Sequence, residues 1–414
     1  MATQEYYDDQ EISDPAERER GHFADFGRIF VAAKENAPAL SGLLAGIDPR
    51  DVGDRAALAA LPVTRKSELV DLQQQDIPFG GFTTVGPGAL ARIFCSPGPI
   101  YDPEGRRADY WRVAQALFAA GFRGGEVIHN CYAYHLTPAG SMMETGAHAL
   151  GCAVVPGGVG NTELQVAAIR DIRPAGLTGT PSFLKIILDK GKEMGADLSS
   201  LTKSLVGAEP LPPSLRKGIE DYGIRCRQIY ASADLGNMAF ESEALDGMIV
   251  AEGIIVEIVR PGTGDPVAEG EVGEIVVTSL CPEYPLLRFG TGDMTAALQG
   301  ISPCGRTNMR IKGWMGRADQ STKVKGMFVR PAMIAEVAKR HPEVAKARLE
   351  VDREGVNDLM VLHCEVAEGG EALAAAITES LQTVTKMKGA VKLSAPGSLP
   401  NDGKVIDDRR SFDE

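Results

Sequence analysis

The sequence predicts an α/β fold in two parts. A large N-terminal body holds mixed or parallel sheets and a β-hairpin subdomain, and a small α+β domain follows it. Two observations predict this arrangement: short apolar segments alternate with helical segments from about residue 89 to residue 280, and the pattern changes after residue 316. The 414 residues are too many for one ordinary domain. We therefore expect two domains, over residues 1–317 and 318–414.

The first elements are helical. Residues 14–34 are charged with interspersed apolar positions, which predicts a helix. The segment Leu61-Pro-Val-Thr-Arg-Lys-Ser-Glu starts a second helix, because Thr64 or Ser67 can cap it. Strands then alternate with helices, beginning with Glu126-Val-Ile-His, and this rhythm indicates βαβ units with a parallel sheet.

The later elements are of another kind. Residues 253–259 and 273–280 flank the turn Pro261-Gly-Thr-Gly-Asp-Pro and predict an antiparallel hairpin. The C-terminal domain is expected to contain a hairpin over 323–329, a helix over 331–340, strands over 347–351 and 359–366, and a helix over 371–386.

Composition narrows the function classes. No run of about 18 apolar residues is present, so we expect no membrane span, and the acidic N-terminus does not have a secretory pattern. The seven cysteines form no C-x-x-C pair, which favours free thiols in a reducing cytoplasm. The net charge of -13 argues against a nucleic-acid partner. The basic stretch 306–330 is either a solvated face or a local site for a small polyphosphate.

Three short motifs follow one another along the second half of the chain. In Arg288-Phe-Gly-Thr-Gly-Asp, a strand over 285–289 ends in a turn that presents Asp293, either as a turn former or as an acceptor for two ribose hydroxyls. Gly316-Arg-Ala-Asp-Gln places a cation and a carboxylate at the domain boundary, as a linker ion pair or as part of a site. Leu399-Pro-Asn-Asp-Gly-Lys presents Lys404, which is either solvated or catalytic.

The order of these motifs is more specific than any one of them, because Gly207-Ala-Glu-Pro and Tyr230-Ala-Ser-Ala-Asp precede them. With these five signals the chain resembles the phenylacetate–CoA ligase family of adenylate-forming enzymes over nearly its whole length. The resemblance runs from Tyr6-Tyr-Asp through Asn161-Thr-Glu-Leu-Gln to Gly403-Lys-Val-Ile-Asp.

The resemblance implies an activity. The family activates a carboxylic acid with ATP and magnesium, releases pyrophosphate and passes the acyl group to coenzyme A, using a large body and a small lid that rotates. The roles it implies are adenine binding by Gly207, Ala208, Glu209, Pro210 and Tyr230; ribose binding by Asp293 with Arg317; further cofactor binding by Ser96, Gly98 and Lys325; a hinge at Asp319; and catalysis by Lys404.

The chain departs from the family at the phosphate loop. The family has S-S-G-T-T-G-K-P where this chain has Ser96-Pro-Gly-Pro-Ile-Tyr-Asp-Pro, so Asp102 replaces a lysine and two prolines remove N–H donors. We expect this loop not to cradle the β- and γ-phosphates in the usual way. Asp234 occupies the position of the magnesium-binding glutamate. Ser242, Ile249 and Ser302 replace zinc ligands beside Cys304, so we expect no zinc.

Three functions stay open at this point. The chain is an acid–CoA ligase or acyl-adenylate ligase, or a non-ligating member that binds a nucleotide or CoA, or an enzyme running another reaction on such a ligand. Tyr132, Tyr134 and His135 either line a pocket for an aromatic acid or pack in the core. Whether the chain forms a homodimer is also open.

Overall fold

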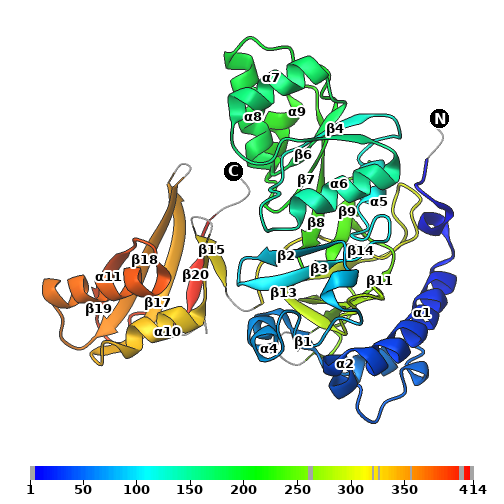
Figure 1. Cartoon of the computed structure of the whole chain (residues 1–414). Helices are drawn as coiled ribbons and strands as arrows, with labels where there is room; N and C mark the ends of the chain where they lie inside the picture. The colour runs from blue at the N-terminus through cyan, green and yellow to red at the C-terminus, as the bar shows by residue number, and fades with distance from the viewer. Residues whose placement is uncertain are drawn as a thin grey trace. The chain divides into compact units, whose positions relative to one another are not determined.

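The computed structural model describes residues 5–259, 264–318, 321–324, 327–354, 357–400 and 405–410. The chain divides into two compact units, the first running to Gly316 and the second beginning at Arg317 (Figure 1). Among the described helices, none combines the length and the apolar character that a bilayer span requires.

The first unit opens with η1 (Asp9–Ile12), α1 (Pro15–Asn36), α2 (Pro38–Leu43), η2 (Pro49–Asp51) and α3 (Arg55–Ala59). The helix α1 begins where predicted, because the Asp14 side chain accepts hydrogen bonds from the amides of Ala16 and Glu17 and a proline follows it. Its inward face buries three phenylalanines: Phe23, Phe26 and Phe30.

The segment after Leu61 differs from the prediction. Thr64–Arg65 forms the strand β1, which pairs in parallel with the start of β13 (Phe289–Leu298). The Thr64 amide donates to the carbonyl oxygen of Arg288 at 3.1 Å, so this backbone is committed to a strand. The helix begins later than predicted, because η3 (Lys66–Glu68) precedes α4 (Leu69–Gln75). Neither Thr64 nor Ser67 caps either of these helices.

The predicted βαβ rhythm is confirmed. The strands β4 (Val127–Asn130), β5 (Ala153–Pro156), β6 (Gly176–Gly179), β7 (Lys203–Val206) and β8 (Arg225–Ser232) pair in parallel in the order β5-β4-β6-β7-β8. The intervening helices are α5 (Ala114–Ala119), α6 (Ala139–Leu150), α7 (Thr162–Ile172), α8 (Pro181–Glu193) and α9 (Pro213–Glu220). Figure 1 shows α5 beside α6, and α7 to α9 together as a second group.

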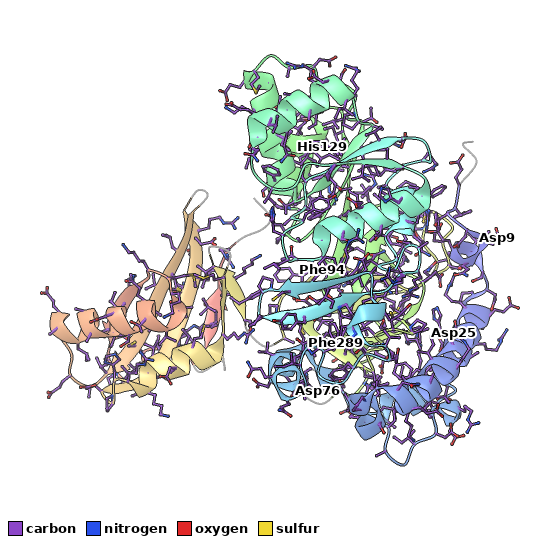
Figure 2. The ribbon with its side chains drawn as sticks, viewed as in Figure 1. Asp9, Asp25, Asp76, Phe94, His129 and Phe289 are labelled. Atoms are coloured by element: carbon purple, nitrogen blue, oxygen red, sulfur yellow. The ribbon has the colours of Figure 1, made fainter. Side chains whose placement is uncertain are left out.

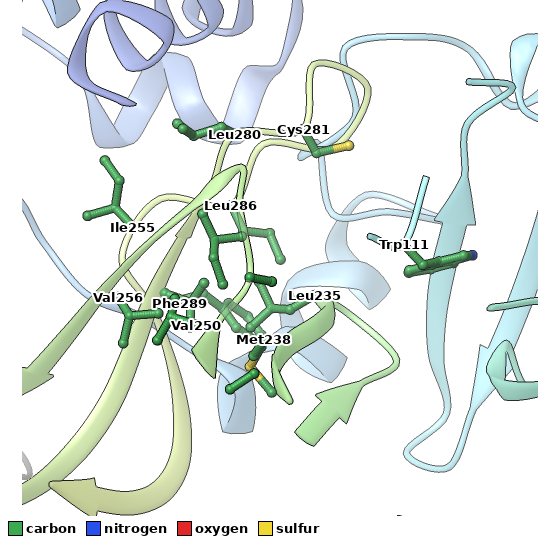
Figure 3. Close-up of a cluster of buried hydrophobic side chains, with 14 of the residues drawn as sticks. Trp111, Leu235, Met238, Val250, Ile255, Val256, Leu280, Cys281, Leu286 and Phe289 are labelled. Atoms are coloured by element: carbon green, nitrogen blue, oxygen red, sulfur yellow. The ribbon is translucent and has the colours of Figure 1, made fainter. Parts of the chain in front are cut away.

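Antiparallel strands extend the same sheet beyond β8. They follow in the order β9 (Gly236–Glu241), β10 (Met248–Val250), β14 (Arg310–Ile311), β13, β12 (Val272–Ser279) and β11 (Ile254–Val259). The β11–β12 pair confirms the hairpin predicted around residue 261. Its strands bury apolar residues on both faces, and Figure 3 shows part of the resulting core around Ile255, Leu286 and Phe289.

A separate two-stranded hairpin lies outside this sheet. After η4 (Pro87–Ala89), β2 (Arg92–Ser96) pairs antiparallel with β3 (Ile100–Glu104). Phe94 on β2 is buried, like Phe289 on β13 (Figure 2). The segment that sequence reasoning treated as a phosphate loop is therefore mostly strand.

The second unit is the small α+β fold that the sequence predicts. It contains the hairpin β15 (Thr322–Val324) and β16 (Met327–Val329), then α10 (Pro331–Lys339), β17 (Val344–Glu354), β18 (Asn357–Val366), α11 (Glu371–Thr385), β19 (Ala390–Ser394) and β20 (Ile406–Asp408). Its main sheet has the order β19-β18-β17-β20, and its own apolar core is centred on Leu349, Leu362 and Ile377.

Candidate functional site

The sequence suggested that Asp293 lies on a turn after a strand. It lies instead on a bulge inside β13. The register between β12 and β13 shifts between Glu274 and Val276, which leaves residues 291–293 outside the regular ladder. Gly292 has φ 74°, and its amide donates to Glu274 Oε1 at 3.1 Å. A bulge re-aims the side chain that follows it, so this local irregularity presents the Asp293 carboxylate.

Two aromatic side chains bind this carboxylate. The Tyr230 hydroxyl, from the end of β8, donates to Asp293 Oδ2 at 2.7 Å. The indole of Trp314 donates to Oδ1 at 3.1 Å. The structure therefore brings together the two residues that the resemblance assigns to the adenine and the ribose. Sequence reasoning missed Trp314, although an aromatic residue two positions before Gly316 was visible.

A buried ion pair fixes the chain just before the bulge. The Arg288 guanidinium donates twice to the Glu257 carboxylate, at 3.0 Å each, and also to the carbonyl oxygens of Ala59, Leu61 and Gly264. Both charged side chains are almost fully buried, at 2% and 3% exposure. Arg288 has φ 41°, an unfavourable conformation that these bonds hold in place.

The loop after β7 carries the predicted adenine-binding residues Gly207, Ala208, Glu209 and Pro210. A Cβ on Gly207 would lie 2.7 Å from the carbonyl oxygen of Ile229, so only glycine fits there. Ala208 has φ 65°, in the left-handed region. The loop follows the carboxyl end of a parallel strand, between the ends of β6 and β8, which is where ligands bind in open α/β sheets.

The three residues predicted for an aromatic-acid pocket have different surroundings. Tyr132 is buried, and its hydroxyl lies close to Gly207. The Tyr134 hydroxyl donates to Glu144 at 2.9 Å and accepts from the Asn130 amide at 2.7 Å. His135 is exposed. Tyr132 is the one whose position beside the adenine loop suits a pocket wall, and the role of all three stays a prediction.

A cluster of two buried carboxylates and a partly exposed lysine lies next to the β2–β3 hairpin. Lys66 forms an ion pair with Asp234 Oδ2, while Asp234 Oδ1 has no hydrogen-bond partner among the described residues. Burial opposes the charge on Lys66, but the attraction of Asp234, Asp102 and Asp293 raises its pKa. Asp102 is fully buried, and hydrogen bonding from Ser96 offsets only part of the cost of ionising it there. Burial and the nearby Asp234 raise the pKa of Asp102 to about 8.

Asp102→Asn is expected to raise the melting temperature, and more at pH 8 than at pH 5. The folded chain keeps a proton on Asp102 up to about pH 8, whereas the unfolded chain loses it near the usual value of 3.8. The carboxyl therefore lowers stability progressively as the pH rises between these values, and asparagine removes this cost. We expect a gain of at least ~3 °C at pH 8, corresponding to about 1 kcal/mol.

Thermal unfolding of both proteins across this pH range measures the effect. The exposed Asp25 of α1 provides a matched control, and Asp25→Asn should leave the melting temperature unchanged at each pH. An equal shift for Asp102→Asn at pH 5 and pH 8 would contradict the raised pKa.

The arrangement around Asp234 does not fit a resident magnesium ion. Its side chain is fully buried, and one of its two oxygens is already paired with Lys66. In the part of the chain that the structure describes, no three His, Cys, Asp or Glu residues gather in a way that could hold a metal. At the positions that the resemblance aligns with zinc ligands, Cys304 Sγ lies 3.1 Å from Ser302 Oγ and 3.5 Å from Arg306, whose guanidinium binds Glu11 at 2.9 Å.

The remaining predicted residues are placed as follows. Ser96 ends β2 and is buried, and Gly98 lies in the exposed β2–β3 turn. Arg317 begins the second unit. Asp319, Lys325 and Lys404 lie outside the described residues, so their roles stay predictions.

Comparison with known proteins gives a consistent result. The family model for AMP-binding enzymes matches residues 110–281. Phenylacetate-coenzyme A ligase of Thermus thermophilus is 33% identical over 377 residues, covering 85% of this chain and 84% of that protein. The ligase of the same name from Aromatoleum evansii is 31% identical, covering 86% of this chain and 84% of that protein.

Solved structures agree on the fold. A 2-hydroxyisobutyryl-CoA ligase, crystallised with 2-HIB-AMP and CoA in the thioesterification state, superimposes with a TM-score of 0.78 at 24% identity. The match covers 98% of this chain and 92% of that protein. The same ligase in the postadenylation state with 2-HIB-AMP gives a TM-score of 0.71 at 25% identity, covering 99% of this chain and 94% of that protein.

Proposed function

Because the chain belongs to the phenylacetate–coenzyme A ligase family, we propose that it is an AMP-forming ligase that activates a carboxylic acid. In the first half-reaction, a carboxylate oxygen attacks the α-phosphorus of ATP and pyrophosphate leaves. In the second, the thiol of coenzyme A or another acceptor attacks the acyl carbonyl and AMP leaves. The observation that carries the proposal is the Asp293 carboxylate held by Tyr230 beside the loop ends of a parallel sheet.

Each group of this site has a proposed task. Asp293 accepts the ribose hydroxyls, because a carboxylate with two oxygens can take further donors beside Tyr230 and Trp314. Tyr230 and the loop from Gly207 to Pro210 enclose the adenine, and Arg317 assists at the ribose. Magnesium is proposed to arrive as the counterion of ATP, since Asp234 does not fit a resident ligand. Lys404 neutralises charge at the carboxylate and the α-phosphate.

The acid is proposed to be aromatic and related to phenylacetate, the acid in the names of the curated relatives. Tyr132 is the proposed pocket wall nearest to the adenine loop. A second candidate, a non-ligating member that binds a nucleotide, CoA or an acyl-adenylate or runs another reaction on it, is favoured by one observation. The segment aligned with the phosphate loop is a closed hairpin that carries a buried aspartate.

The test uses the whole chain with ATP, magnesium and CoA against a panel of arylacetic, benzoic and short aliphatic acids. Pyrophosphate and acyl-CoA are measured separately. We expect both products with at least one aryl acid, and a loss of at least about tenfold in Asp293→Asn, because the ribose contact weakens by about 1.4 kcal/mol or more. Asp25→Asn is the remote control. Nucleotide binding without pyrophosphate release from any acid would favour the second candidate instead.

A further inference from the structure

The β2–β3 hairpin has few groups that could bind phosphate. Its turn, Pro97-Gly-Pro, keeps a single backbone N–H, that of Gly98, because proline has none. Ser96 and Ile100 on either side of the turn pair with each other in the ladder. A loop that holds a polyphosphate instead aims several successive N–H groups at it.

Two outward N–H groups of the hairpin, those of Tyr101 and Cys95, are also committed. The Tyr101 amide donates to Gln73 Oε1 at 2.8 Å, and the Tyr101 carbonyl oxygen accepts from Gln73 Nε2 at 2.9 Å. The Cys95 amide donates to the carbonyl oxygen of Leu136 at 2.8 Å. Opening the hairpin to free these groups would therefore break its attachments on both strands.

The base of the hairpin is anchored as well. Glu104, which is buried, accepts from the Ser141 hydroxyl of α6 at 2.7 Å and from Arg92 at 3.1 Å. The first bond joins β3 to α6 in the body of the first unit, and the second joins β3 to β2. The hairpin is therefore a fixed element of the body, and not a free loop that could wrap around a ligand.

The charge beside the hairpin also disfavours a polyphosphate. Two buried carboxylates, Asp102 and Asp234, face one ammonium group, that of Lys66. Below about pH 8 Asp102 keeps its proton and the Lys66 cation is paired with Asp234, so the cluster offers no unpaired cation to additional phosphates; above that pH the ionised Asp102 adds a surplus negative charge that repels them. By contrast, Asp293 and Tyr230, which are proposed to hold the ribose and the adenine, are both present and hydrogen-bonded to each other.

We infer that the nucleotide site of this chain is selective for a nucleoside monophosphate or its acyl ester over a nucleoside triphosphate. The inference rests on the proposed function, because it assumes that the Asp293 site binds adenine nucleotides. It adds that the hairpin contributes no binding energy for the β- and γ-phosphates. A chain of this kind takes acyl-adenylate readily and uses ATP only at high concentration.

Calorimetry on the whole chain tests the inference with AMP, ATP with magnesium, and an acyl-sulfamoyl adenosine as a stable acyl-adenylate analogue. We expect AMP to bind at least as tightly as ATP, and the analogue at least about tenfold more tightly than ATP. ATP binding tenfold more tightly than AMP would overturn the inference and leave the proposed function standing. A chain that binds none of the three would overturn both.

Two variants examine the hairpin itself. The double variant Pro97→Ser with Pro99→Thr restores two N–H donors, and Asp102→Asn, measured above pH 8, removes one negative charge. Each should tighten ATP relative to AMP several-fold, as measured by the ratio of the two dissociation constants. Pro87→Ser, a proline exchange in the exposed η4 turn, is the matched control and should leave that ratio unchanged. An unchanged ratio in both hairpin variants would show that this segment does not face the phosphates and would overturn the inference.

Discussion

Lys404→Ala is expected to lower the rate of pyrophosphate release by about 100-fold or more while nucleotide binding changes little. When a carboxylate attacks a phosphorus atom surrounded by anionic oxygens, negative charge develops that must be neutralised. A positioned charge at such a transition state is typically worth about 3 kcal/mol or more. Lys404 is assigned this role by the resemblance, and its position lies outside the described residues. Asp293 and Tyr230 are proposed to hold the ribose and the adenine, so nucleotide affinity should persist.

The measurement separates the two half-reactions. Pyrophosphate release reports adenylation, and thioester formation from a supplied acyl-adenylate reports the second step, which should largely survive in Lys404→Ala. The exposed Lys392 of β19 offers a matched control, and Lys392→Ala should leave both rates unchanged. A folded Lys404→Ala protein that loses both half-reactions equally would contradict the assigned role.

The parts of the fold that local pattern specifies were predictable from the sequence. The alternation of β4 to β8 with helices, the β11–β12 hairpin and the helix α1 all follow from periodicity and capping at Asp14. The strand β1 was not predictable, because Thr64–Arg65 becomes a strand only by pairing with Phe289, more than two hundred positions away. Nonlocal pairing overrode a local cap signal.

The same distinction holds for the site. Asp293 and Tyr230 were identified from motif order, and the structure joins them by one hydrogen bond. The burial of Asp102 was hidden from sequence, because the exposure of a residue depends on the elements packed around it. Sequence reasoning treated Asp102 as a loop residue facing phosphate, whereas it lies on β3 close to Asp234 and Lys66. The clash of charges that this creates is visible only in three dimensions.

Arg288→Met is expected to destabilise the first unit strongly, by about 3 to 5 kcal/mol, and to weaken AMP binding as well. The substitution removes five hydrogen bonds and leaves the Glu257 carboxylate buried without its cation. The carbonyl oxygens of Ala59, Leu61 and Gly264 lose their common donor, and the Asp293 bulge lies five positions further along the chain. Denaturant unfolding and AMP calorimetry measure the two effects.

The double variant Arg288→Met with Glu257→Leu distinguishes the reason for the loss. If the unpaired buried carboxylate is the main cost, the double variant should recover much of the stability, because two apolar side chains of similar volume can replace a buried ion pair. It should not recover all of it, since the carbonyl oxygens of Ala59, Leu61 and Gly264 still lack their donor. Arg50→Met removes an ion pair at the surface and should leave the unfolding midpoint unchanged. If Arg288→Met is no less stable than the native chain, or the double variant is less stable than the single one, this account of the ion pair is wrong. Recovery of stability without recovery of AMP affinity would instead show that Arg288 positions Asp293 in addition to balancing Glu257.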